Sequence, residues 1–263
     1  MTLLLQGRTV LVSGVGPGLG RRVAEHAAAE GANVVLGART EENLAKTASD
    51  IEAGRPGSTA WRPTDIAVEA DCTALAALAV ERFGRIDAVI HVAALDSHFG
   101  GLADADFNAW RRVMDVNLIG TLQLTRACLP ALRERGGSVV IIGTQSAVAS
   151  PTQVRQAAYA ASKGALTSAM YSMARELGPD RIRVNTVLPG WMWGPAVEAY
   201  VGWTASTEGV PEDEVRGRLT QRMALPELAT DGDVADAALF FASDRAKSIT
   251  GQSLLVNAGE LMR

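Results

Sequence analysis

A tyrosine and a lysine four residues apart, Tyr159 and Lys163, are the side chains of this sequence best suited to chemistry. The segment between them is rich in alanine and predicts a helix, on which positions i and i+4 lie on one face. A protonated Lys163 beside Tyr159 favours the phenolate and is expected to bring the pKa of the phenol below its reference value of about 10. Tyr159 is then a candidate proton donor and acceptor near neutral pH. The same spacing also occurs on ordinary solvated helix faces.

A glycine-rich turn near the start of the chain is typical of a dinucleotide site. Residues 9–13 are apolar and mostly β-branched, the turn over 14–20 (GVGPGLG) follows, and apolar residues then recur at helical spacing through position 30. Glycines let the backbone approach a pyrophosphate closely, and the free N–H groups of the first helical turn face the phosphates. The order strand, glycine turn, helix therefore predicts a bound dinucleotide. A glycine turn without a ligand is the alternative.

The residues after the second strand bear on the choice of dinucleotide. That strand is expected over 33–37, so the first strand, helix and strand together span about thirty residues. A carboxylate at this strand end usually binds the adenosine ribose, but Ala38 and Arg39 follow here. A guanidinium suits a 2′-phosphate, so NADP(H) is favoured over NAD(H). The alternative is that Arg39 only ends the strand at the surface.

Four polar side chains lie where the predicted sheet places chemistry or packing. Asp65, after a third strand, could face the adenine or cap the helix over 67–83. His91 ends an apolar strand and is expected to be a packed core residue without an acid–base role. Asn117 lies within a long helical stretch, where asparagine is unfavourable, which indicates a role other than helix formation. Ser146 follows a fifth strand, at the edge where open α/β sheets bind their ligands.

The alternation of apolar strands and helical segments predicts an α/β fold. Strands are expected over 9–13, 33–37, 58–62, 86–92, 138–143, 183–188 and 253–257, and the helices between them include 67–83, 104–133 and 231–243. A loop is expected over 151–156. No linker, repeat or low-complexity tract divides the chain. Residues 1–263 are therefore expected to form a single doubly wound Rossmann domain, with a seven-stranded, mostly parallel sheet and helices on both faces.

Residues 191–225 break this rhythm. Trp191, Trp193, Tyr200 and Trp203 fall close together there, among glycine, proline and acidic residues. We expect the segment to form a substrate lid over a pocket, and its rings to favour an apolar or aromatic substrate. The alternative is a surface excursion packed by its own aromatic residues.

Composition and charge exclude several classes of protein. Of the 263 residues 48% are hydrophobic and 21% charged, which is typical of a globular domain. The formal net charge is −4, and basic residues do not cluster along the sequence beyond pairs, so no nucleic-acid partner is expected. No apolar stretch or leader indicates a membrane or secretion, so we expect no membrane partner and a cytoplasmic location. Cys72 and Cys128 lack metal or redox spacing and are expected to be buried and reduced, with no metal site.

In this order the motifs resemble those of the short-chain dehydrogenase/reductase family over essentially the whole chain. SGVGPGLG at 13–20 is similar to the family's TGxxxGIG turn, and Pro189-Gly190 is similar to its PG motif after the sixth strand. ITGQSLLVNAG near the C-terminus is similar to its last strand. The family's catalytic Asn, Ser, Tyr and Lys are matched, with the serine thirteen residues before the tyrosine, by Asn117, Ser146, Tyr159 and Lys163. The segment WMWGP after the PG motif resembles that of a minority subgroup.

Two places depart from the family pattern. Where the family usually has NNAG after the fourth strand, this chain has HVAA, from His91 to Ala94. Where a threonine commonly follows the PG motif to bind the nicotinamide carboxamide, Gly194 stands here. Both departures concern the placement of the nicotinamide.

The resemblance implies an NAD(P)(H)-dependent oxidoreductase that interconverts a ketone and a secondary alcohol. Tyr159 would be the general acid and base, and Lys163 would bind the nicotinamide ribose and lower the Tyr159 pKa. Ser146 would hold the substrate oxygen, and Asn117 would keep a water-linked proton path open to Lys163. Cofactor contacts are implied at Gly14, Gly18, Leu19, Gly20, Arg39, Asp65, Ile66, Ala93, Tyr159, Lys163, Pro189, Gly190 and Met192.

The resemblance also implies a homotetramer or dimer, formed through the helices that carry Asn117 and Tyr159. The partner it implies besides a second copy is a small-molecule carbonyl or alcohol. The alternative function is a non-catalytic, cofactor-sensing or scaffolding protein with the same fold. Such a protein would be expected to lose the tyrosine or the lysine, and this chain keeps both.

Overall fold

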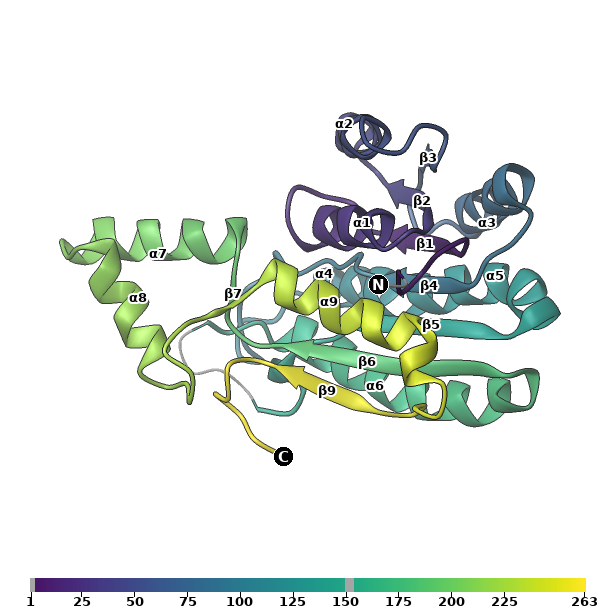
Figure 1. Cartoon of the computed structure of the whole chain (residues 1–263). Coiled ribbons are helices and arrows are strands. Elements are labelled where there is room, and N and C mark those ends of the chain that lie inside the picture. Colours follow the sequence, from purple (N-terminus) through teal and green to yellow (C-terminus); the bar gives the residue numbers. More distant parts are fainter. Residues whose placement is uncertain (1–2, 150–153) are drawn as a thin grey trace.

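A twisted parallel sheet with helices on both faces forms the centre of the molecule (Figure 1). The computed structural model describes residues 3–149 and 154–263, so the loop expected over 151–156 lies partly outside the described residues. The strands of the sheet follow the order β3-β2-β1-β4-β5-β6-β9, and every pairing between them is parallel. Their bounds are β1 Thr9–Ser13, β2 Asn33–Ala38, β3 Thr59–Pro63, β4 Ala88–His91, β5 Gly137–Ile142, β6 Ile182–Pro189 and β9 Ser253–Val256. The expected seven-stranded α/β fold is confirmed.

The α-helices occupy the connections between strands. They are α1 Leu19–Ala29, α2 Glu41–Glu52, α3 Glu69–Phe83, α4 Phe107–Met114, α5 Thr121–Arg135, α6 Ala157–Leu177, α7 Pro195–Glu208, α8 Glu212–Thr220 and α9 Asp231–Ala242. No helix among the described residues is both long and apolar enough to cross a membrane.

Two apolar cores lie on the two faces of the sheet. Successive side chains of a strand point to opposite faces, so Val10 and Val12 of β1 join one core and Leu11 joins the other. The first core is completed by α1, α2 and α9, and the second by α3, α5 and α6. Burial on both faces explains why the central strands are almost continuously apolar. Cys72 and Cys128 are free and buried in the second core, as expected.

The order of the strands creates a crevice at one edge of the sheet. β1 pairs with β2 on one side and with β4 on the other, so the chain reverses its direction of travel across the sheet between these neighbours. In open α/β sheets, ligands bind outside the carboxyl ends of the strands at such a reversal. The carboxyl ends of β1, β4, β5 and β6 are therefore the place to look for a site.

The long helix expected over 104–133 is interrupted, which corrects that prediction. α4 and α5 are separated by a π-helix, η1 (Asp115–Gly120), which contains Asn117. Single turns of π-helix are frequent at functional sites because the extra residue redirects a side chain. Gly120 closes this turn against the loop before α3, where an added Cβ would lie 2.9 Å from the Ile66 carbonyl oxygen.

The segment 191–225 is mostly helical and packs largely against itself. α7 and α8 project from the sheet at the left of Figure 1, and β7 (Met192–Trp193) pairs with β8 (Ala229–Thr230) at their base. The Trp191 and Tyr200 rings lie 5.0 Å apart, and the guanidinium of Arg216 lies 4.7 Å above the Trp193 ring. Trp203 is 67% exposed. The rings of Trp191, Trp193 and Tyr200 thus contact residues of the segment itself, and Trp203 faces solvent.

Candidate active site

Helix α6 presents Tyr159 and Lys163 on one face, as their spacing predicts. The Lys163 ammonium nitrogen lies 5.8 Å from the centre of the Tyr159 ring. Nζ of Lys163 also donates a hydrogen bond of 2.7 Å to the carbonyl oxygen of Ile142, the last residue of β5. Lys163 is only 2% exposed. The lysine therefore ties α6 to the carboxyl edge of the sheet and fixes the position of the phenol beside it.

The expectation that Lys163 brings the Tyr159 pKa below 10 is wrong for this arrangement. Burial raises the pKa of Tyr159 well above its ordinary value, and the negative charge of Asp96 raises it further. Burial also lowers the pKa of Lys163 to about 8, against a smaller opposing effect of Asp96. Both shifts have one cause, since a group removed from water favours its neutral form. The phenol is thus a proton donor through the neutral pH range.

Replacing Lys163 by methionine is expected to remove a pH dependence of stability. The Lys163 pKa is 10.5 in its ordinary state and about 8 in the folded protein. Between these values the unfolded chain binds more protons, so the free energy of unfolding of the wild type rises with pH across this window. The contribution is about 3 kcal/mol at most. Chemical denaturation at pH 7 and pH 10 checks this. The free energy of unfolding of the wild type, taken relative to that of K163M, should be higher at pH 10 than at pH 7. A difference that stays constant would contradict the burial argument.

Asn117 fastens the loop after β4 to helix α6. Its Oδ1 accepts a hydrogen bond of 2.6 Å from the Leu95 N–H, and its Nδ2 donates to the Leu95 carbonyl at 3.1 Å. Nδ2 also donates to the Ser162 hydroxyl at 2.9 Å, and Asn117 is fully buried. The asparagine thus has the role other than helix formation that its sequence context indicates, and the π-helix places its amide in this position.

Two hydroxyls follow β5, and the one nearer the strand acts on the phenol. Thr144 is buried, its Oγ1 accepts a hydrogen bond of 3.2 Å from the Ser146 N–H, and its side chain slightly lowers the pKa of the Tyr159 phenol against the larger effect of burial. Among the described residues, the Ser146 hydroxyl has no hydrogen bond. The sequence points to Ser146 by its spacing and does not single out Thr144. The available signal was its place two residues beyond the end of β5.

A cavity of about 340 Å³ opens at the reversal between β1 and β4. Of the expected cofactor contacts, five line it: Gly14, Arg39, Asp65, Ile66 and Ala93. Four polar residues that the sequence did not single out as cofactor contacts also line it: Thr40, Asn43, Thr64 and Asp96. The remaining expected contacts lie outside its lining.

The glycine turn forms the wall of this cavity with bare backbone. Gly14 has a φ of +86°, and an added Cβ would lie 2.3 Å from the Ala93 nitrogen. At Gly16 an added Cβ would meet no atom within 4 Å, so the cavity reaches the main chain. At Gly18 the nearest atom to an added Cβ is Cδ of Pro195, the first residue of α7, at 3.5 Å. A turn of this shape fits the close approach of a pyrophosphate.

Other expected cofactor contacts pack against the sheet or its end. An added Cβ at Gly20 would lie 2.0 Å from the Gly14 carbonyl oxygen, so this glycine permits the contact between α1 and the turn. Leu19 is buried in the first core, and Met192 packs against the same core. Gly190, which follows Pro189 at the end of β6, lies against the Gln145 side chain, 2.7 Å from an added Cβ.

The structure shows the contacts of Asp65 and His91. Asp65 lines the cavity, and its Oδ1 also accepts a hydrogen bond of 3.0 Å from the Ala67 N–H. It stabilises the turn before α3 and not the helix itself, because α3 begins at Glu69. His91 is buried, and its Nε2 lies 2.9 Å from the Thr125 hydroxyl. Burial and the nearby Lys163 lower the His91 pKa to about 3, which confirms it as a neutral core residue.

Comparison with known proteins gives relatives along nearly the whole chain. A family model described as enoyl-(acyl carrier protein) reductase matches residues 14–260. An L-rhamnose 1-dehydrogenase (NAD(P)(+)) from Azotobacter vinelandii is 33% identical, over 98% of this chain and 98% of its own. A trans-4-hydroxycyclohexanecarboxylate dehydrogenase from Sinomonas cyclohexanicum is 31% identical, over 96% of this chain and 92% of its own.

Solved structures show the same fold. A short-chain dehydrogenase/reductase from Brucella melitensis has a TM-score of 0.88 and 29% identity, with 100% of both chains covered. An L-sorbose reductase from Gluconobacter frateurii, in complex with NADPH and L-sorbose, has a TM-score of 0.93 over 100% of both chains. Its identity is 23%, so this second likeness concerns the fold alone.

Proposed function

Because the chain belongs to the short-chain dehydrogenase/reductase family of NAD(P)(H)-dependent oxidoreductases, which interconvert ketones and secondary alcohols, we propose that Tyr159 is its general acid and base. The observation that carries the proposal is the position of the Tyr159 ring beside the buried Lys163, whose Nζ is held at the carboxyl edge of the sheet by the Ile142 carbonyl. Incubation of the protein with either cofactor and a panel of ketones tests the activity itself, through consumption of the reduced cofactor.

In this mechanism Tyr159 supplies the proton. When bound, the dinucleotide donates or accepts the hydride. The raised Tyr159 pKa keeps the phenol protonated near neutral pH, which suits proton donation to a carbonyl oxygen during reduction. Lys163, held by the Ile142 carbonyl, fixes the phenol and can share its proton. Asn117 keeps the loop that carries Leu95 and Asp96 against α6.

A hydroxyl beside Tyr159 would hold the substrate oxygen. We assign this role to Thr144, because its buried side chain lowers the pKa of the Tyr159 phenol while its Oγ1 is oriented by the Ser146 N–H. Ser146, which the family pattern selects, remains the competing candidate. A hydrogen-bond donor placed at a developing charge stabilises the transition state more than the ground state.

The cavity at the glycine turn suits the adenosine half of the dinucleotide. The residues fit the group, because the bare backbone at Gly14 and Gly16 leaves room for phosphates and Arg39 stands exposed at the end of β2. Arg39 would bind a 2′-phosphate through two parallel hydrogen bonds, which favours NADP(H) over NAD(H). Pro189, Gly190 and Met192 would lie toward the nicotinamide end.

Replacing Arg39 by alanine is expected to raise KM for NADPH about tenfold or more, because a charged hydrogen bond to the phosphate is lost. KM for NADH should stay nearly unchanged, since NADH has no phosphate at that position. Steady-state kinetics with both cofactors measure this. Arg62→Ala is the matched control, as Arg62 is an exposed arginine in the neighbouring strand β3 that does not line the cavity. An equal loss with both cofactors would overturn the preference for NADP(H).

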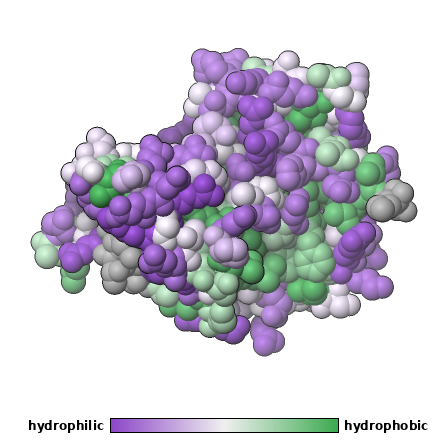
Figure 2. All heavy atoms as spheres, turned by 60° about the vertical axis from the view of Figure 1, so that its left-hand side comes forward, coloured by the Kyte–Doolittle hydropathy of each residue, from purple (hydrophilic) through white to green (hydrophobic). Residues whose placement is uncertain are grey.

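The surface at the carboxyl ends of the strands bears on the substrate class, and the exposed helix faces bear on the assembly. Figure 2 shows the surface of the molecule after a turn that brings the left of Figure 1 forward. On this face an apolar area is bordered by hydrophilic residues. The carboxyl ends of the strands point to this side, so an apolar or aromatic carbonyl substrate remains our proposal, with 191–225 as its lid and the WMWGP segment as the mark of a subgroup. A homotetramer or dimer would form through α4, η1, α5 and α6, where Phe107 of α4, Ile119 of η1 and Tyr171 of α6 are exposed.

A further inference from the structure

A second cavity, of about 500 Å³, lies at the opposite edge of the sheet. Its walls come from the residues that precede β1 and β4, from the starts of β5 and β6, and from the turn after α9. The dinucleotide cavity lies at the carboxyl ends of the strands and shares no lining residue with it. A cavity of this size is large enough for a small molecule.

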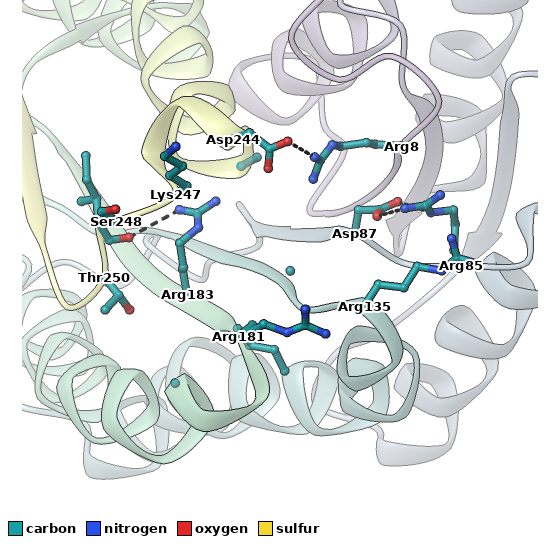
Figure 3. A pocket seen from close by; sticks show the side chains of 16 residues that line it. Arg8, Arg85, Asp87, Arg135, Arg181, Arg183, Asp244, Lys247, Ser248 and Thr250 are labelled. Carbon is teal, nitrogen blue, oxygen red and sulfur yellow. Dashed lines mark hydrogen bonds and ion pairs between the residues drawn. The ribbon is translucent and has the colours of Figure 1, made fainter.

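The lining of this second cavity is strongly basic (Figure 3). Six cationic side chains line it: Arg8, Arg85, Arg135, Arg181, Arg183 and Lys247. Only two acids accompany them, and each is held by one arginine, Asp87 by Arg85 and Asp244 by Arg8. Six minus two leaves four cations, which form no ion pair within residues 3–149 and 154–263. This excess stands out in a chain whose net charge is −4.

The backbone brings two of the uncompensated arginines together. The Gly137 N–H donates a hydrogen bond of 3.1 Å to the Arg181 carbonyl, and an added Cβ at Gly136 would lie 3.0 Å from the Arg181 Cβ. Arg135 therefore ends α5 directly beside Arg181. Arg181 has a φ of 58°, a left-handed conformation that is uncommon for any residue with a side chain. The connection between α5 and β5 thus places the backbones of two arginines that line the cavity side by side.

Arg183 adds a partly buried charge to the same group. Its guanidinium donates to the Ser243 carbonyl at 3.1 Å and to the Ile249 carbonyl at 3.4 Å, which holds it in the wall of the cavity. Burial lowers the pKa of Arg183, the negative charge of Asp244 opposes this, and the positive charge of Arg8 adds a smaller lowering effect. Arg183 is thus a partly buried cation whose neighbours include further cations, and a bound anion would offset their charge.

We infer that this cavity, which we call the amino-edge cavity, binds a small anion that contains a diphosphate group. A diphosphate carries several negative charges near neutral pH, which suits the four uncompensated cations. The planar guanidinium groups of Arg135 and Arg181 can each bind phosphate oxygens in pairs, and Arg183 can donate with the N–H groups that the Ser243 and Ile249 carbonyls leave free. The hydroxyls of Ser248 and Thr250 on the same wall can complete the contacts. The inference does not depend on the proposed function.

The test is a calorimetric titration of the full chain with inorganic pyrophosphate. The titration is made in the presence of saturating NADPH, so that pyrophosphate cannot occupy the glycine turn, and at 0.15 M salt, where weak surface attraction is screened. The wild type should bind pyrophosphate, and R135A/R181A should bind it at least tenfold more weakly. Arg112→Ala, which removes an exposed arginine from α4 outside both cavities, should bind as the wild type does.

A second variant, Lys247→Glu, and a titration with citrate test the inference further. Lys247→Glu changes an exposed side chain without altering the core, so it serves if R135A/R181A fails to fold, and it should also weaken binding at least tenfold. Undetectable binding to the wild type at millimolar pyrophosphate would overturn the inference. So would unchanged affinity in Lys247→Glu or in a folded R135A/R181A protein. Equally tight binding of citrate would overturn the assignment to a diphosphate, because citrate offers only carboxylates.

Discussion

Tyr159→Phe is expected to lower turnover about a hundredfold or more and to leave the affinity for the reduced cofactor nearly unchanged. The substitution removes one oxygen and keeps the ring, so packing against the Lys163 side chain is retained. The lost group is the proposed proton donor for the carbonyl oxygen, whose charge develops only as the hydride arrives. Steady-state ketone reduction gives the turnover, and quenching of intrinsic fluorescence by NADPH gives the cofactor affinity.

Tyr171→Phe is the matched control for this experiment. Tyr171 lies on the same helix, α6, but is 51% exposed, so loss of its hydroxyl should change neither quantity. The pH dependence provides a second check. Because the Tyr159 pKa lies above its ordinary value, ketone reduction should keep its rate into the alkaline range, whereas alcohol oxidation should rise with pH. Wild-type turnover in Tyr159→Phe would refute the assignment of the general acid.

Thr144→Ala is expected to lower turnover about a hundredfold, and Ser146→Ala is expected to cost much less. Loss of a hydrogen-bond donor that contacts a developing oxyanion costs on the order of a hundred- to a thousandfold in turnover. The buried Thr144 side chain is the hydroxyl that acts on the Tyr159 pKa, and its Oγ1 accepts a hydrogen bond from the Ser146 N–H. The Ser146→Ala variant keeps that backbone N–H, so the orientation of Thr144 is preserved.

A conservative variant separates chemistry from structure at this position. Thr144→Ser retains the hydroxyl and loses only a methyl group, so it should recover most of the turnover that Thr144→Ala loses. NADPH affinity should stay the same in all three variants, because neither hydroxyl lines the cavity at the glycine turn. The opposite ranking, with Ser146→Ala inactive and Thr144→Ala active, would restore the assignment that the thirteen-residue spacing suggests.

The order of strands and helices could be predicted because it depends on local patterns. Apolar runs such as 86–92 and 138–143 can be buried only between two layers of helices, which fixes a parallel sheet. The juxtaposition of Tyr159 and Lys163 was equally local, since one helical turn determines it. Element bounds differed by one or two residues in most cases. The largest difference was the π-helix at 115–120, whose extra residue leaves no mark on apolar periodicity.

The chain by itself thus determined the fold, the family and the pair of side chains at the centre of the site, because each rests on neighbours within a few turns of helix or strand. The pKa directions of Tyr159 and Lys163, the effect of Thr144 on Tyr159, and the gathering of arginines at the amino-edge cavity were decided by tertiary structure alone. The physical reason is that desolvation and charge act between residues far apart in sequence. Burial is the largest influence on the Tyr159 pKa, and only folding places Arg8, Arg135 and Arg183 around one space.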